Sequence, residues 1–335
     1  MEVAIDTILQ YLAKQQRPDG SFDSLESYPP EHPLGHKNWF FTDPSPFIHA
    51  NILCALQDIP APLARSITQK GCQFIQQRQE WRGLWRFWQH GGTTHNVPID
   101  LDDTALCSYI LTRNGFRVHN QRYLLANIDS QGYFLTWLLP HWRLWRYPGL
   151  YRFLRRDIRH LQAVLASPML STADKEPAVA ANVLLYLGET SKTKRCIQQI
   201  LQQLERPCEA PLQYYDDPLV IFYHVSRAYR NGVLSFRGAA AAFEQYCSDM
   251  PTPANVFKQA MLATTLLNFD LLNQSRLEPI IQTIQKSATS QAMESYIYFV
   301  SKDRHFRAGS PELTAALCAE ALATYHRRYA SAYKA

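Results

Sequence analysis

Six segments of the chain are apolar on nearly every side of a helical repeat, and each has a proline, an aspartate or a serine among its first two residues. They span residues 43–59, 100–115, 174–189, 216–232, 252–269 and 310–325. A helix that is apolar all round is buried, and these residue types are common at the first positions of helices. The pattern therefore predicts six buried inner helices.

Six further segments alternate with the inner ones and carry glutamine, lysine and arginine beside a narrower apolar stripe. They span residues 3–16, 62–79, 117–127, 191–205, 236–247 and 274–287. One polar face is typical of a helix in an outer layer. The alternation predicts an all-α fold, a single (α/α)6 toroid of six inner and six outer helices that occupies residues 1–335 as one domain. An open helical solenoid is the alternative.

Three of the outer segments are followed by a glycine and an aromatic residue, in "RPDGSF", "WRGLW" and "DSQGYF". Glycine permits a sharp reversal of the chain, and an aromatic ring can fill the seam between neighbouring helices. Valine and isoleucine do not alternate with polar residues over a convincing length, so few strands are expected.

Composition narrows the class of protein. With 46% hydrophobic and 19% charged residues, the chain reads as an ordered globular protein. Its apolar stretches fall short of the roughly 20 residues that a membrane-spanning helix needs, and the N-terminus lacks the features of a signal peptide. The seven scattered cysteines are typical of reduced thiols in a cytoplasm. A net charge of +5 neither requires nor excludes an anionic partner.

The stretch "DLDDTA" places Asp100, Asp102 and Asp103 at the start of the second inner segment. An N-cap and one acidic residue in the first turn would satisfy the helix end, so the third carboxyl exceeds that need. Like charges at a poorly solvated helix end disfavour the ionised state and raise at least one pKa. A carboxyl that stays protonated at neutral pH is a proton donor. Helix capping alone is the alternative explanation.

The motif also matches a known family. "DLDDTA" fits the DxDD motif of class II terpene cyclases, and "PAVAANVLL" (177–185) resembles a stretch of the bacterial diterpene cyclases. The predicted toroid and the glycine-aromatic turns look like one domain of squalene-hopene cyclase. Because the chain has length for one toroid only, it resembles most the single-domain class II cyclases of meroterpenoid pathways.

The resemblance implies a reaction and roles for the three aspartates. Asp102 would protonate a terminal alkene or epoxide, while Asp100 and Asp103 would orient it and hold its proton. The implied substrate is a polyprenylated small molecule such as a geranylgeranylated hydroxybenzoate, cyclised to fused rings through a carbocation cascade. No metal or other cofactor is implied. Class I chemistry is not expected, because Val220 stands where a DDxxD motif needs its last aspartate, and Asp216 and Asp217 are interpreted as helix caps.

Three other functions remain open on the sequence. A class II cyclase of geranylgeranyl diphosphate would need a basic pocket, for which Lys37, Arg82 and Arg86 are candidates, and Mg²⁺ is expected only for such a substrate. A protein prenyltransferase β-subunit shares the toroid but needs Asp, Cys and His zinc ligands, and no convincing trio is found. A toroid can also serve as a non-catalytic interaction module.

A carbocation cascade needs a dry cavity that stabilises positive charge, and aromatic rings do this through their quadrupole. Aromatic residues are frequent in the predicted loops between helices, although any one of them can be plain core. The predicted lining consists of Trp39, Trp85, Phe87, Trp88, Tyr214, Tyr215 and Phe222.

Three polar residues lie inside predicted inner helices. Asn182 is costly in an apolar helix unless it is hydrogen-bonded, and its repeat position predicts support for the Asp102 proton. His49 and His224 are assigned to the same substrate site. A hydrogen-bonded core residue is the alternative for all three.

The segment 134–160 fits no repeat and is treated as an insertion. It interleaves tryptophan, tyrosine and leucine with arginines, a composition typical of an interfacial membrane contact. We therefore predict a peripheral membrane contact; an amphipathic helix packed on the barrel is the alternative. Nucleic-acid binding is not expected, because the basic residues come without a recognition motif.

Overall fold

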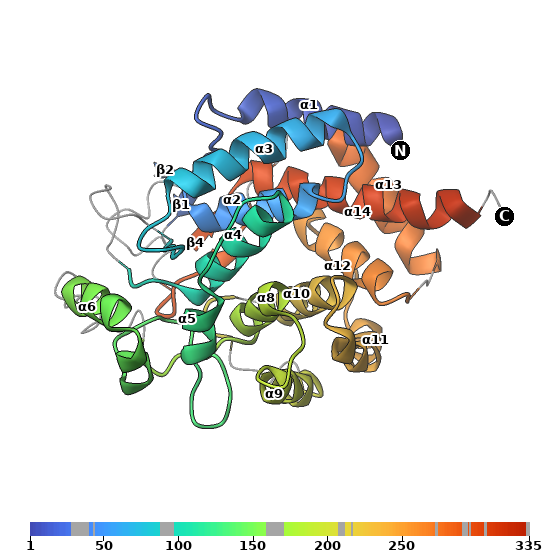
Figure 1. The fold of residues 1–335 in the computed structure, drawn as a ribbon. Coiled ribbons are helices and arrows are strands. Elements are labelled where there is room, and N and C mark those ends of the chain that lie inside the picture. Colours follow the sequence, from blue (N-terminus) through green and yellow to red (C-terminus); the bar gives the residue numbers. More distant parts are fainter. Residues whose placement is uncertain are drawn as a thin grey trace.

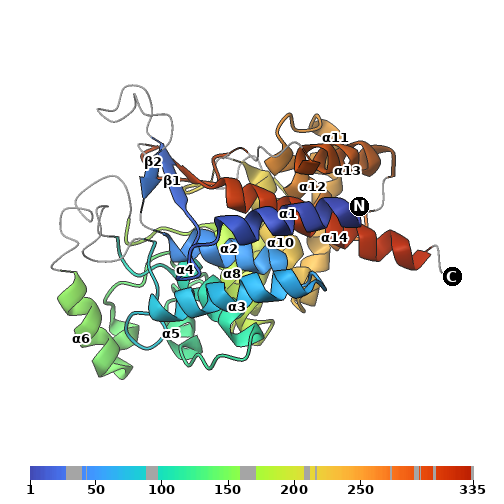
Figure 2. The ribbon, with the colours of Figure 1, turned by 90° about the horizontal axis from the view of Figure 1, so that it is seen from above.

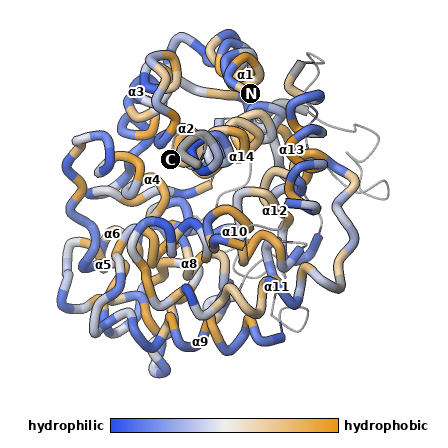
Figure 3. The backbone as a smooth tube through the Cα atoms, turned by 90° about the vertical axis from the view of Figure 1, so that its right-hand side faces the viewer, coloured by the Kyte–Doolittle hydropathy of each residue, from blue (hydrophilic) through white to orange (hydrophobic). Residues whose placement is uncertain are grey.

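The fold is that of a computed structural model, which describes residues 1–27, 40–42, 44–87, 97–158, 171–206, 212–215, 217–271, 274–289, 294, 296–304 and 307–332. Within these residues six helices form the inner layer: α2 (Pro46–Leu56), α4 (Leu101–Arg113), α8 (Pro177–Leu187), α10 (Pro218–Arg230), α12 (Val256–Asn268) and α14 (Pro311–Ala332). Each contacts the next, and α14 contacts α2, so the ring is closed (Figure 3). The predicted toroid is confirmed, and an open solenoid is excluded.

The outer layer surrounds this ring (Figure 1). It consists of α1 (Glu2–Gln15), α3 (Pro62–Gln77), α5 (Gln121–Ala126), α9 (Lys194–Leu204), α11 (Ala239–Asp249) and α13 (Gln274–Thr289). Every predicted outer segment overlaps one of these helices. The short 3-10 helix η3 (Leu234–Gly238) precedes α11 and contacts α9, α10 and α11.

The inner helices begin where the sequence offers caps. The side chain of Asp217 accepts a hydrogen bond from the Leu219 amide at 2.9 Å, and Asn255 caps α12 by accepting from the Lys258 amide at 2.8 Å. Proline occupies the first turn of α2, α8 and α10, where its missing N–H is not needed. The capping role predicted for Asp217 is confirmed, whereas Asp216 lies outside the described residues.

The glycine-aromatic turns have the predicted geometry. Gly20, Gly83 and Gly132 have φ angles of +87°, +87° and +88°, in the left-handed region that favours glycine. The aromatic residue two positions later in the chain is buried in each case. At the second turn the Trp85 indole donates to the Ile75 carbonyl of α3 at 2.9 Å, which closes the seam between α3 and the next inner helix.

Among the described residues, four short strands form one antiparallel sheet at the rim where the inner helices begin (Figure 2). They are β1 (Ser24–Ser27), β2 (Phe40–Thr42), β3 (Phe299–Val300) and β4 (Arg307–Gly309), in the order β2-β1-β4-β3. Strands of this length are too short to show a period of two in the sequence. The sheet leads directly into α2 and α14.

The insertion forms the 3-10 helix η1 (Trp142–Arg146) and α6 (Pro148–Asp157), which lie outside the two-layered ring (Figure 1). Arg86, which precedes α4, reaches Asp157 at the end of α6 with an N–O distance of 3.1 Å and so ties the insertion to the rim. No helix in the described part of the chain is both long and apolar enough to cross a membrane.

Two glycines give a matched test of the turn geometry. A Cβ on Gly20 would lie 2.3 Å from the Lys70 carbonyl oxygen, whereas a Cβ on Gly115, at φ +84°, would meet nothing within 4 Å. The left-handed conformation alone costs roughly 1–2 kcal/mol for an alanine. We expect Gly115→Ala to lose about that much free energy of unfolding in a denaturant titration, and Gly20→Ala to lose at least twice as much. Equal losses would contradict the close packing of this turn against α3.

Candidate active site

The three aspartates lie at the N-terminal end of α4, and all are buried. Asp100 is the N-cap, and its Oδ1 accepts a hydrogen bond from the Asp102 amide at 2.7 Å. The backbone around it is fixed from two sides: the Asp100 amide donates to the Trp85 carbonyl at 3.2 Å, and the Leu101 amide donates to the Thr136 carbonyl at 2.9 Å. Asp100 thus performs the capping, and the other two carboxyls are free for another role.

The carboxyl of Asp102 is held by two donors from other parts of the ring. The Asn182 amide nitrogen on α8 donates to Oδ1 at 2.7 Å, and the Tyr215 hydroxyl, just before α10, donates to Oδ2 at 2.7 Å. Asn182 and Tyr215 are both fully buried. The contact between Asn182 and Asp102 that the repeat pattern predicted is therefore present.

Burial governs the acidity of the trio. Desolvation raises the pKa of Asp103 well above its ordinary value, and the neighbouring Asp100 and Asp102 raise it further. The pKa of Asp100 is also raised well above its ordinary value, by desolvation and by the charge of Asp102. Desolvation raises the pKa of Asp102 to about 6, while the hydrogen bonds from Tyr215 and Asn182 favour its ionised form and limit the shift.

One buried cation near this site escaped the sequence analysis. Arg227 on α10 is almost fully buried, lies 4.6 Å over the ring of Tyr223, and donates to the Asn51 side chain at 3.2 Å. Its charge also lowers the pKa of Asp102. An arginine inside the apolar run "PLVIFYHVSRAYR" was a visible signal, because a buried charge is costly without partners.

A further buried acid, Glu176, was also missed. It is the N-cap residue of α8, and its Oε2 accepts hydrogen bonds from the backbone amides of Gln213 at 2.6 Å and Tyr214 at 3.2 Å. These bonds fix the segment that presents Tyr215 to Asp102. Desolvation raises the pKa of Glu176 to about 8. The sequence contained a signal for this residue, because Glu176 stands directly before the proline of an inner helix, much as Asp100 stands directly before α4.

Aromatic residues gather beside Tyr215 at the rim, all of them buried except the half-buried Phe299. We call this group the rim aromatic cluster: Phe47, Phe87, Tyr214, Tyr215, Tyr298 and Phe299. The ring centroids of Tyr215 and Tyr298 are 5.7 Å apart, and Phe299 stacks on Phe87 at 5.3 Å. Tyr298 and Phe299 were not predicted. Their segment, "YIYF", precedes the last inner helix just as "QYY" precedes the fourth, so the repeat pattern contained the signal.

Two of the predicted lining residues, Phe222 and Trp85, and His49 of the predicted substrate site face the outer layer instead. Phe222 packs against Phe243 and Tyr246 of α11, with centroid distances of 4.9 and 5.4 Å. His49 accepts from the Phe22 amide at 2.7 Å, and Trp85 is bound to α3 as described above. This corrects their predicted place in the lining. Trp39 and Trp88 lie outside the described residues.

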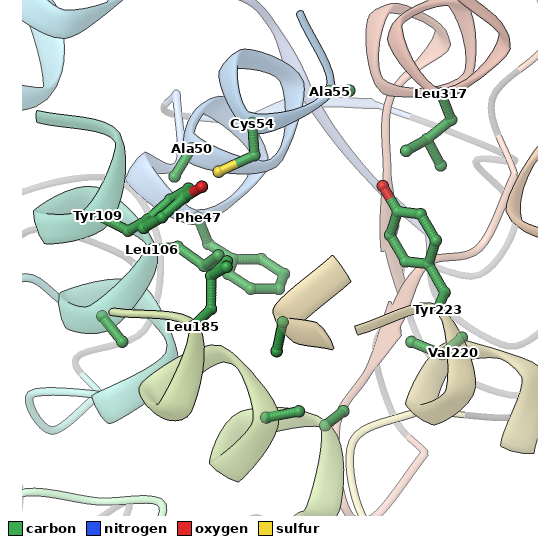
Figure 4. Close-up of a cluster of buried hydrophobic side chains, with 14 of the residues drawn as sticks. Phe47, Ala50, Cys54, Ala55, Leu106, Tyr109, Leu185, Val220, Tyr223 and Leu317 are labelled. Atoms are coloured by element: carbon green, nitrogen blue, oxygen red, sulfur yellow. The ribbon is translucent and has the colours of Figure 1, made fainter. Parts of the chain in front are cut away.

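Below the rim, the middle of the ring holds mostly apolar side chains beside the buried Arg227 and Asn51. Side chains from α2, α4, α8, α10 and α14 gather there, among them Leu106, Leu185, Tyr223 and Leu317 (Figure 4). His224 also lies inside, where its Nε2 is 2.8 Å from the Tyr298 hydroxyl. Burial and the charge of Arg227 lower the pKa of His224 well below its ordinary value, so its imidazole is neutral.

The predicted basic pocket for a diphosphate does not assemble among the described residues. Arg86 is buried, and its guanidinium donates hydrogen bonds to the Glu80 and Asp157 carboxylates and to the Val97 carbonyl. Arg82 is exposed and stacks on Trp81 at 5.3 Å, and Lys37 lies outside the described residues. Within the same residues, no group of three or more His, Cys, Asp or Glu side chains is placed to hold a metal ion.

No protein-family model matches the sequence, and no curated protein matches it. Solved structures do match. A protein from Actinoplanes superposes with a TM-score of 0.70 at 13% sequence identity, over 96% of this chain and 98% of that chain. The type II terpene cyclase MstE from Scytonema superposes with a TM-score of 0.66 at 12% identity, over 96% of each chain.

Two further matches extend this comparison. A complex of a MstE variant with its substrate, geranylgeranyl dihydroxybenzoate, superposes with a TM-score of 0.65 at 12% identity, over 96% of each chain. The ent-copalyl diphosphate synthase from Streptomyces platensis superposes with a TM-score of 0.56 at 12% identity, over 83% of this chain and 50% of that chain. At such identities the similarity shows the fold. The fold is therefore that of the class II (type II) terpene cyclases, as the sequence predicted.

The raised pKa of Glu176 predicts a pH-dependent stability. Because that pKa rises from 4.5 to about 8 on folding, the stabilisation is complete below about pH 4.5 and is lost as the pH rises through about 8. Glu176→Gln cannot ionise, so at pH 8.5 it should melt at a higher temperature than the wild type, and its free energy of unfolding should be larger by on the order of a few kcal/mol. At pH 5 the gain should vanish. Glu244→Gln, on the exposed face of α11, is the control, and its melting temperature should depend on pH as that of the wild type does. If the melting temperature of Glu176→Gln also varied with pH in parallel with the wild type, the raised pKa of Glu176 would be contradicted.

Proposed function

We propose that this protein is a class II terpene cyclase in which Asp102 protonates the end of a polyprenyl chain. The observation that carries the proposal is the buried Asp102 carboxyl, held on both oxygens by Asn182 and Tyr215 beside a cluster of aromatic rings. The fold shared with terpene cyclases supports the same reaction class. A non-catalytic toroid would have no need for this arrangement of buried acids.

The carboxyl is suited to donate a proton. With a pKa of about 6, it carries the proton in about one molecule in ten at pH 7 and is a stronger acid than a fully desolvated carboxyl. Each oxygen of Asp102 accepts one hydrogen bond, which leaves a second lone pair on each oxygen for the transferable proton. The two donors also stabilise the carboxylate that remains after transfer.

The raised pKa values of Asp100 and Asp103 explain why three carboxyls can stand together. The raised pKa values favour the neutral forms of Asp100 and Asp103, which reduces their repulsion of the Asp102 carboxylate after it has given up its proton. Their role in the proposal is to orient Asp102 and to share its proton, as the family resemblance implied.

The remainder of the site suits a cation cascade. The Asp102 proton bonds to one carbon of the terminal alkene, the other carbon becomes cationic, and each following double bond closes a ring and moves the charge along. The reaction ends with loss of a proton, so substrate and product are isomers. Tyr215, Tyr298 and Phe299 provide aromatic faces in a buried environment that stabilise the charge.

A prenylated aromatic is the substrate class that we propose. MstE, which binds geranylgeranyl dihydroxybenzoate, spans the same single toroid as this chain. A diphosphate substrate is the second candidate, and the hydrogen bonds that all three Arg86 nitrogens donate to protein groups weigh against it. A peripheral membrane contact through the insertion belongs to the proposal, because Trp142 and Trp145 are both exposed there.

Replacing the proposed acid tests the reaction directly. Asp102→Asn keeps nearly the same volume and can still accept a hydrogen bond from Asn182 and donate one to the Tyr215 oxygen, but it has no transferable acidic proton, so cyclisation of geranylgeranylated hydroxybenzoate should fall by about 100- to 10,000-fold. The melting temperature should stay close to that of the wild type. Asp217→Asn, the same change at the N-cap of α10, is the matched control and should keep its activity. Ring product from a folded Asp102→Asn at a rate within about tenfold of wild type would remove Asp102 as the acid.

Metal removal separates the two substrate classes. Protonation of an alkene leaves no diphosphate to ionise, so turnover of a prenylated arene should survive EDTA. The same assay with geranylgeranyl diphosphate is the comparison. Loss of activity in EDTA and its rescue by Mg²⁺ would move the assignment to a diphosphate cyclase.

A further inference from the structure

A groove lies outside the ring, where the insertion packs against α5 and the turn that follows α8. It encloses about 840 Å³, part of which is open to solvent. The residues that line it are Arg122, Leu125, Ala126, Ile128, Trp142, Arg143, Arg146, Tyr147 and Lys192. None of these takes part in the site around Asp102.

The lining is basic, and two of its cations are held in place. Arg122 lies 4.8 Å over the ring of Tyr123 and 5.6 Å over that of Tyr147. Arg143 lies over Trp142 and donates to the Asp129 carbonyl at 3.0 Å. These contacts reduce the entropy that each arginine would lose on binding an anion.

The other two cations are available. Arg146 and Lys192 are exposed, and neither makes a hydrogen bond or an ion pair with another residue in the described part of the chain. No carboxylate is among the described residues that line the groove. The groove therefore presents four positive charges without a counter-charge in its wall.

Exposed tryptophans adjoin the groove. Trp142 is 65% exposed and Trp145 is 66% exposed, and among the described residues the other large apolar side chains so exposed are Val3 and Leu234. The surface continues onto α6, where Arg152, with its neighbours at 155 and 156, is also exposed. Tryptophan is enriched at the level of lipid headgroups, where one part of the ring is apolar and the other is wet.

We propose that this groove binds the phosphate-bearing headgroup of an anionic phospholipid at the surface of a bilayer, with Trp142 and Trp145 inserted beside it. The four cations match the headgroup charge, and the apolar floor of Leu125 and Ile128 matches the glycerol and upper acyl region. A soluble anion would match the cations but would leave the exposed tryptophans without a role. The inference does not rest on the proposed reaction, because its test measures binding and not turnover.

The insertion that forms the groove begins next to the part of the ring that carries Asp102. The segment before η1 pairs with the start of α4, since the Leu138 amide donates to the Ile99 carbonyl at 2.9 Å. The insertion therefore leaves the ring at the rim that carries Asp102. A bilayer docked on the groove would lie against that rim, where a membrane-dissolved polyprenyl chain could enter.

The test is co-sedimentation of the whole protein with vesicles of phosphatidylcholine alone and of phosphatidylcholine mixed with phosphatidylglycerol. The wild type should bind the mixed vesicles at low salt and bind more weakly as salt is added. Each basic residue near an anionic surface is worth enough that the double variant Arg146→Gln/Lys192→Gln should bind about thirtyfold more weakly. Trp142→Ala/Trp145→Ala should also weaken binding. Melting curves of each variant establish that it is folded.

A charge-matched control separates the groove from general attraction. Arg65→Gln/Lys70→Gln removes one arginine and one lysine from the exposed side of α3 and should leave binding within about threefold of wild type. Equal losses in the two double variants would overturn the groove in favour of long-range charge. No binding of the wild type to mixed vesicles would overturn it outright, and full displacement by millimolar inorganic phosphate would replace the lipid with a soluble anion.

Discussion

Two hydrogen bonds to one buried carboxyl determine whether the site exists. Asp102 receives them from Asn182, 80 positions further along the chain, and from Tyr215, 113 positions further. Neither donor can reach Asp102 unless α4, α8 and the start of α10 stand side by side in the closed ring. The fold therefore brings remote donors to a carboxyl that would otherwise be too costly to bury.

The three buried aspartates differ in the hydrogen bonds that their carboxyls accept. Asp100 accepts a backbone hydrogen bond and caps the helix, Asp102 accepts two side-chain hydrogen bonds and stays acidic, and both Asp103 oxygens lack a hydrogen-bond partner among the described residues. A buried carboxyl without hydrogen-bond donors is costly to ionise, and the pKa of Asp103 is accordingly raised well above its ordinary value. The helix end can thus hold three acids because the local donors are shared unequally between them.

The sequence predicted the two helical layers and the contact between Asn182 and Asp102, but it did not predict which way a side chain on an inner helix points. Apolar residues cover every side of an inner helix, so the sequence alone cannot tell that Phe222 faces outward while its neighbours Tyr223 and His224 face inward. The predicted place of His49 in the substrate site was wrong for the same reason. The sheet and Tyr298 were missed because short rim segments show no period, although aromatic runs before inner helices recur along the chain.

The closure of the ring also bears on how the chain acquires its structure. The last inner helix, α14, packs between α2 and α12, and β4 beside it pairs with β1 near the other end of the chain. Contacts of such large sequence separation form slowly, because the intervening chain must be ordered first. Until α14 has been synthesised and packs between α2 and α12, the incomplete ring exposes apolar sides of its inner helices. We expect aggregation, and the need for a chaperone, to be greatest in that interval.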